Sequence, residues 1–144
     1  MIINIKKLNE NALIPTRGSE GAAGVDLYAC TSSSIVIMPH NTVKIGTGLA
    51  IELPYGYFGA SFARSGLATK HGLRPSNCVG VCDEDYRGEY VVALHNDTDE
   101  PQTINPMERI AQLVVMPYLP VEFNEVNELS DTERGDGGFG STGK

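Results

Sequence analysis

Apolar and β-branched residues gather in short runs along this chain, and polar or Gly- and Pro-containing turns separate the runs. Runs of this kind predict β-strands, because branched and aromatic side chains pack well on a pleated surface. The predicted strands are IINI at 2–5, SIVIM at 34–38, TVKIGTGLAIEL at 42–53, YFGASFA at 57–63, EYVVALHN at 89–96 and QLVVMPYLPVEF at 112–123.

Helical periodicity is weak throughout, since no stretch of about twelve residues repeats apolar positions at helical spacing. SGLATKHGL at 65–73 predicts a turn or two of helix at most. Many short strands separated by turns indicate an all-β fold, a jelly-roll-like sandwich or barrel. The length of 144 residues suits one domain.

The composition changes near residue 130, where hydrophobic strands give way to LSDTERGDGG. A segment so poor in apolar side chains has little reason to fold by itself. We therefore expect residues 1–125 to form a β jelly-roll body and residues 126–144 to form a flexible C-terminal arm.

The formal net charge of −7 argues against binding to nucleic acid, which relies on clustered basic residues. It does not exclude a small anionic ligand, which needs only a few local donors. No apolar run approaches the roughly 20 residues that cross a bilayer, and the N-terminus has no signal-peptide pattern. We expect a cytoplasmic protein without a membrane partner.

The three cysteines cannot all pair within one chain, and no histidine stands at a zinc-binding spacing from Cys78 and Cys82. We expect these two to be small, reduced core residues on one strand face.

The chain ends on RGDGGFGSTGK at 134–144, in which five of eleven residues are Gly. Its G-x-x-x-x-G-K pattern lacks the following Ser or Thr and the helix of a P-loop, so we exclude that site. Glycines still let backbone N–H groups approach phosphate oxygens, and Arg134, Ser141 and Thr142 add donors. The segment is either a disordered end or a phosphate-binding flap.

Two further segments combine charge with small residues. FARSGLATKHGL at 62–73 puts Arg64, Ser65 and Gly66 at the end of a strand, where they either receive an anion or cap a short helix. AAGVDLYA at 22–29 holds one acid, Asp26, which must be paired structurally or lie near a cation, because unpaired buried charge is costly.

ERIAQLVV at 108–115 places Arg109 and Gln112 at the head of a strand, and Arg109 could equally be an internal salt-bridge partner. NCVGVCDEDYRGEYVVAL at 77–94 predicts a β-hairpin with acids at its tip. The tip is either a solvated turn or a site in which Asp83, at the edge of a strand, activates water.

Taken in order and spacing, AAGVDLYA, ARSGLATKHGL, NCVGVCDEDYRGE, ERIAQLVV and RGDGGFGSTG resemble the five motifs of the trimeric dUTP pyrophosphatases, or dUTPases. The resemblance spans residues 22–143. Two positions depart from the family pattern: Ala63 stands where proline is usual, and Cys82 where isoleucine is usual. Cys82 raises the question of sensitivity to oxidation.

The resemblance implies a homotrimer of jelly-roll subunits with the family's β-clip fold. Each active site is then built from more than one chain, and the C-terminal arm closes over a neighbour's site. The implied reaction is hydrolysis of dUTP to dUMP and pyrophosphate with Mg²⁺, which keeps uracil out of DNA and supplies dUMP for dTMP synthesis.

The resemblance also implies a role for individual residues. Asp83 matches the acid that deprotonates the water attacking the α-phosphate, and Asp26 matches the acid that holds Mg²⁺ through water. Tyr86 matches the residue under the deoxyribose, and Phe139 the ring that stacks on uracil. Phosphate contacts are implied for Arg64, Ser65, Gly66, Gln112, Arg134, Gly140, Ser141 and Thr142, and uracil contacts for the backbone around Asn77, Val81, Cys82 and Val91.

Two other functions stay open at this point. A dCTP deaminase shares this fold, although the sequence lacks a strong match to its serine and arginine pattern and GFGSTG favours the dUTPase. A nucleotide-sensing regulatory relative is the second alternative, and the intact Asp83, Arg64 and Phe139 argue against loss of activity.

Overall fold

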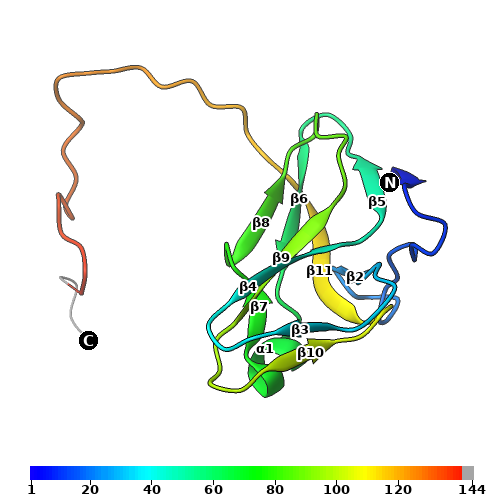
Figure 1. The fold of residues 1–144 in the computed structure, drawn as a ribbon. Helices are drawn as coiled ribbons and strands as arrows, with labels where there is room; N and C mark the ends of the chain where they lie inside the picture. The colour runs from blue at the N-terminus through cyan, green and yellow to red at the C-terminus, as the bar shows by residue number, and fades with distance from the viewer. Residues whose placement is uncertain (141–144) are drawn as a thin grey trace.

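A computed structural model of the chain describes residues 1–140 (Figure 1). The strands are β1 (Asn4–Lys7), β2 (Val25–Tyr28), β3 (Ile35–Ile37), β4 (Thr42–Gly46), β5 (Leu49–Glu52), β6 (Tyr57–Phe62), β7 (Leu73–Pro75), β8 (Val79–Cys82), β9 (Val91–Asn96), β10 (Gln102–Ile104) and β11 (Arg109–Pro117). One helix, α1 (Ser65–His71), lies between β6 and β7.

The strands form antiparallel sheets. The largest has the order β2-β11-β6-β8, a second has the order β4-β9-β7, and β1-β5 and β3-β10 form two-stranded sheets. Strands distant in sequence lie side by side; for example, β11 lies between β2 and β6 and pairs with both. The predicted all-β, jelly-roll-like fold is confirmed.

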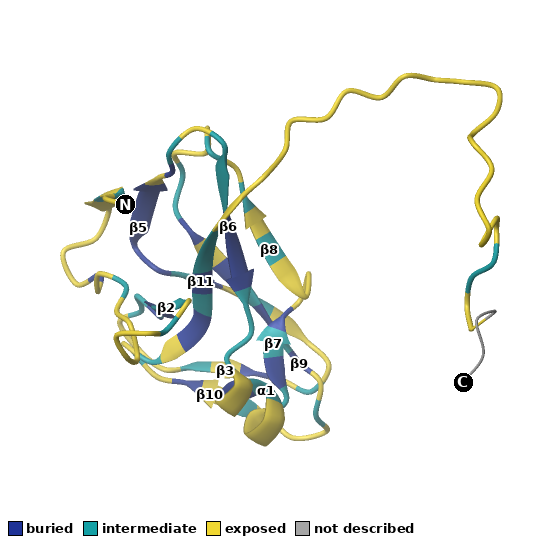
Figure 2. Cartoon of the chain, turned by 180° about the vertical axis from the view of Figure 1, so that it is seen from behind, coloured by how far each residue is buried: buried dark blue, intermediate teal, exposed yellow. Residues whose placement is uncertain are grey.

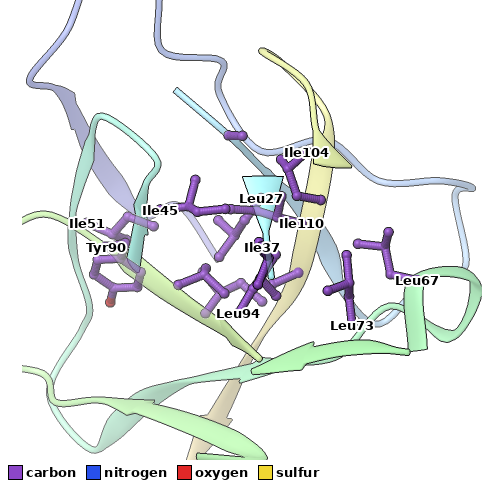
Figure 3. Close-up of a cluster of buried hydrophobic side chains, with 14 of the residues drawn as sticks. Leu27, Ile37, Ile45, Ile51, Leu67, Leu73, Tyr90, Leu94, Ile104 and Ile110 are labelled. Carbon is purple, nitrogen blue, oxygen red and sulfur yellow. The ribbon is translucent and has the colours of Figure 1, made fainter. Parts of the chain in front are cut away.

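One hydrophobic core lies between the sheets (Figure 3). Ile37, Ile45 and Leu94 are fully buried in it, as are Leu27 and Ile110 from the largest sheet. Burying each such side chain contributes about 1.5–3 kcal/mol relative to leaving it exposed. Along β9 buried positions alternate with less buried ones, as expected for a strand with one face on a core. Figure 2 shows β5 as mostly buried, whereas β8 has exposed and intermediate positions.

The predicted hairpin at 77–94 is wrong. β8 pairs with β6 and β9 pairs with β4 and β7, so the strands flanking the acidic tip do not pair with each other. The run at 42–53 contains two strands, because the chain turns at Gly48, whose φ of 68° is in the left-handed region.

The predicted strand at 112–123 ends at Pro117, and Pro120 follows shortly; neither proline has an N–H to donate to a ladder. From residue 118 to 140 the chain leaves the sheets as an extended, mostly exposed segment (Figures 1 and 2).

The short helix at 65–71 is confirmed, and it ends at Gly72 with a left-handed φ of 60°. In the described part of the chain, no helix is long and apolar enough to span a membrane.

The three cysteines are free, but the expectation for Cys78 is wrong. Cys78 lies in the turn before β8, where its N–H donates to the carbonyl of Pro75 at 3.0 Å, and its side chain is exposed. Cys82, at the end of β8, is half-buried and packs against the core.

Candidate active site

Asp26 is held between two arginines. Arg64 Nε donates a hydrogen bond to Asp26 Oδ1 at 2.8 Å, and Arg109 Nη1 donates to Oδ2 at 3.3 Å. The Asp26 side chain is only 13% exposed, against 50% for Arg109. In the single chain Asp26 is therefore paired with two arginines, and Arg109 is one of its salt-bridge partners.

Sheet order brings these residues together. β11 lies between β2 and β6, so Gln112 on β11 stands opposite Asp26 on one side and Phe62 on the other. The Gln112 Nε2 group donates to the carbonyl of Ala63 at 2.9 Å, which fixes the chain just before Arg64. Gly24 leaves space for this amide, because a Cβ there would lie 2.9 Å from Gln112 Oε1.

A cavity of about 200 Å³ opens at this point and is lined by Asp26, Arg64, Ser65, Gly66 and Gln112, with Arg109 and residues of the 18–24 segment at its rim. The positive guanidinium groups, a hydroxyl and an amide give it the donors that an anion requires. We call this the arginine pocket. The sequence did not single out Gly18, since a small residue before a strand carries no chemical signal.

Asp83 lies elsewhere in the subunit. It follows β8, the edge strand of the largest sheet, and its place at the end of a strand agrees with the sequence prediction. It lines an open cleft of about 610 Å³ together with Phe58, Val81, Glu84, Asp85 and Tyr118. Glu84 is engaged, because its carboxylate accepts the N–H of Gly56, whereas no hydrogen bond to the Asp83 carboxylate is found among the described residues.

Two ionisable groups beside Asp83 have shifted pKa values. Burial raises the pKa of the Cys82 thiol; the Asp83 charge adds to the rise and the Tyr90 hydroxyl opposes it. Desolvation also raises the pKa of the Tyr118 hydroxyl, with Glu84 contributing in the same direction. Both groups therefore stay protonated at neutral pH.

The β6–β8 ladder separates Asp83 from the arginine pocket. Cys82 stands opposite Gly59 and Val79 opposite Phe62, so Asp83 and Arg64 lie beyond opposite ends of the ladder. By this register Asp83 is level with Phe58, and the six residue rises from Phe58 to Arg64 amount to roughly 20 Å. One chain therefore does not bring its own Asp83 to its own arginine pocket.

The family model for dUTPase matches residues 10–143. The chain belongs to the dUTPase family. A deoxyuridine 5'-triphosphate nucleotidohydrolase of Nautilia profundicola is 51% identical over the full length of both chains, and one of Hydrogenobaculum sp. is 49% identical over 99% of each.

Solved dUTPase structures share the fold. The Staphylococcus bacteriophage 80alpha dUTPase with dUPNHPP has a TM-score of 0.90 at 30% identity, covering 99% of both chains. A mutant dUTPase from phage phi11, described as coordinating a structural Mg(II) ion, has a TM-score of 0.78 at 25% identity, covering 89% of this chain and 98% of that one.

In this dUTPase-family chain the remaining predicted site residues are spread over the surface. Val81 and Val91 are exposed, by 62% and 47%, on the strands that flank the acidic tip. The Tyr86 hydroxyl donates to the carbonyl of Glu89 at 3.0 Å, and its ring lies 6.2 Å from the ring of Tyr90. Asn77 lies in the turn that leads into β8.

The arm residues lie away from both sites in the single chain. Arg134 Nε donates to the carbonyl of Gly137 at 2.8 Å, and Phe139 is fully exposed, with Gly140 beside it. The predicted phosphate ligands Ser141 and Thr142 lie outside the described residues.

Proposed function

We propose that this chain hydrolyses dUTP to dUMP and pyrophosphate. The observation that carries the proposal is the arginine pocket. In a member of the dUTPase family, Asp26, Arg64 and Gln112 from three strands or strand ends converge on one cavity suited to phosphates. The curated relatives bear the name of this activity, and the phage enzyme was solved with a dUTP analogue.

We further propose that the working enzyme is a homotrimer with shared active sites. The separation of about 20 Å between Asp83 and Arg64 supports this, because both groups must reach one triphosphate. A neighbouring chain can supply the missing half. The division into a body (1–125) and an arm (126–144) belongs to the same proposal, in which the arm closes over the active site of a neighbouring subunit.

In the proposed mechanism, Asp83 accepts a proton from the water that attacks the α-phosphorus in line. A bond forms between the water oxygen and the α-phosphorus while the bond to the bridging oxygen breaks, and pyrophosphate leaves. General-base catalysis of this kind contributes about 10²–10⁴-fold. Arg64, Ser65, Gly66 and Gln112 bind phosphate oxygens, and Arg134, Gly140, Ser141 and Thr142 close on the distal phosphates.

The residues present fit a magnesium ion held chiefly by the substrate. No cluster of three His, Cys, Asp or Glu side chains suited to a metal occurs among the described residues, and both Asp26 oxygens bind arginines. Mg²⁺ commonly keeps several waters and binds one or two carboxylates plus phosphates, so Asp26 would hold the ion through water. When bound, the ion neutralises charge on the phosphates.

We assign uracil recognition to backbone groups around Asn77, Val81, Cys82 and Val91. β8 is the edge strand of its sheet, so one side of its backbone can form hydrogen bonds with a base. Tyr86 packs against the deoxyribose and leaves no room for a 2′-hydroxyl. Phe139 of the arm stacks on the base.

The proposed role is to keep uracil out of DNA and to supply dUMP for dTMP synthesis. The cytoplasm is the proposed location, because the three free cysteines suit a reducing compartment.

The test is pyrophosphate release from dUTP, UTP, dCTP and dTTP, assayed side by side with Mg²⁺. We expect dUTP to be preferred by at least about tenfold in kcat/KM over each of the others. Release of ammonia from dCTP would instead indicate the deaminase of the same fold. Binding of dUTP without turnover would indicate a nucleotide sensor.

A further inference from the structure

Tyr86 is held against the chain that follows it. Its hydroxyl donates a hydrogen bond to the carbonyl oxygen of Glu89 at 3.0 Å. Its ring lies 6.2 Å from the Tyr90 ring, with an interplanar angle of 46°. Gly88 carries no side chain, and a Cβ there would overlap the Tyr86 hydroxyl. The position of the Tyr86 ring therefore depends on where residues 88–90 lie.

Residues 89 and 90 are in turn fixed to the connection between β4 and β5. The carboxylate Oε1 of Glu89 accepts the N–H of Gly48 at 2.7 Å. The N–H of Tyr90 donates to the carbonyl of Leu49 at 2.8 Å, and the Tyr90 carbonyl accepts from Thr47 Oγ1 at 2.7 Å. The Glu89 carboxylate thus adds a third hydrogen bond to the two that join the Tyr90 backbone to the β4–β5 connection.

The β4–β5 connection has space for this carboxylate. Gly46 faces it, and a Cβ at Gly46 would overlap Glu89 Oε1. The Glu89 side chain is partly buried, which strengthens a charge-assisted hydrogen bond relative to one in open water.

We propose that Glu89 is a positioning residue that sets the preference for deoxyribonucleotides by fixing Tyr86 from the β4–β5 connection. The proposal rests on the proposed function, in which Tyr86 packs against the deoxyribose. Without the Glu89 bond, residues 86–90 move more freely and Tyr86 no longer excludes a 2′-hydroxyl. UTP therefore gains relative to dUTP, while the general base and the arginine pocket are unchanged.

The experiment measures kcat/KM for dUTP and for UTP with the full-length enzyme. We expect Glu89→Ala to lower the dUTP/UTP ratio about tenfold, the effect of one charge-assisted hydrogen bond. Glu89→Gln should keep most of the ratio, because the amide oxygen still accepts the Gly48 N–H. Gly46→Ala should lower the ratio as well, since its methyl group displaces the carboxylate without removing it.

A double-variant cycle separates positioning from general weakening. In the Tyr86→Ala background the ring that Glu89 positions is absent, so adding Glu89→Ala should leave the dUTP/UTP ratio unchanged. A further loss of the ratio in that background would show that Glu89 does not act through Tyr86.

Glu108→Ala is the matched control. The Glu108 carboxylate also accepts a backbone N–H, that of Asn105 at 2.9 Å, but in the turn before β11. It should alter stability without altering the dUTP/UTP ratio.

The outcomes also separate this proposal from the proposed function. If Tyr86→Ala collapses the ratio while Glu89→Ala and Gly46→Ala keep it within about twofold, the role of Glu89 is wrong and the dUTPase activity stands. If wild-type enzyme hydrolyses dUTP and UTP equally, or neither, both proposals fail. If Glu89→Ala does not fold, Gly46→Ala and Glu89→Gln decide the question.

Discussion

Arg64 and Asp83 lie beyond opposite ends of the β6–β8 ladder, about 20 Å apart along the strands. A site that needs both must take them from different chains. We therefore expect Arg64→Ala and Asp83→Asn chains, each inactive alone, to recover part of the activity when they are co-assembled. The measurement is pyrophosphate release by verified mixed trimers.

The control for that experiment is a chain carrying both substitutions, mixed with Asp83→Asn chains. No site in this mixture has an intact Asp83, so activity should stay absent. Recovery missing from the first mixture would mean that one chain builds its whole site.

Asp83→Asn should lower kcat by about 10² or more, because the amide cannot accept the proton from the attacking water. Binding of the non-hydrolysable analogue dUpNHpp should persist, as measured by calorimetry, because Asp83 lies away from the arginine pocket. A variant that keeps more than about a tenth of the wild-type kcat would show that another group is the base.

Asp26→Ala should lower the free energy of unfolding by about 2 kcal/mol, because it leaves Arg64 and Arg109 without their shared carboxylate in a partly buried site. Urea unfolding at fixed protein concentration measures the change. Asp99→Ala is the matched control. The Asp99 side chain is 93% exposed and lies beside His40, so removing its carboxylate should change stability little. Equal losses in the two variants would contradict the structural role of Asp26.

Removal of the chain after Glu133 should leave the melting temperature nearly unchanged, because the described part of this segment buries little apolar surface. Catalysis should fall sharply, since the proposed contacts from Arg134, Ser141, Thr142 and Phe139 are lost. Phe139→Ala alone should weaken dUTP binding by about 1–3 kcal/mol and pyrophosphate binding much less. Full activity in the truncated enzyme would remove the arm from the mechanism.

Cys82 should react slowly with iodoacetamide at pH 8 in the folded protein. Burial raises the pKa of its thiol, so the reactive thiolate is scarce below that pKa and appears only as the pH rises toward it. Cys78 is exposed and should be labelled first, as peptide mass spectrometry can measure. In urea the two rates should converge. Rapid labelling of Cys82 in the folded enzyme would mean that the site is open to thiol modification.

The sequence determined the fold class and several chemical groups because these depend on local order. Alternating and branched residues specify strands wherever a core is available, and Gly72 ends the helix by its own backbone freedom. The positions of Arg64 and Asp83 at strand ends were both predicted from neighbouring residues.

Strand pairing was decided by the tertiary structure. The apolar runs around the acidic tip are compatible with a hairpin, yet β8 pairs with β6 and β9 pairs with β4 and β7. These pairings place side chains of both β8 and β9 against one shared core. Pairing across long sequence separations also placed Arg64 and Arg109 on one carboxylate, and Glu89 on the N–H of Gly48. No local pattern encodes such contacts, since each depends on which distant strands pack side by side.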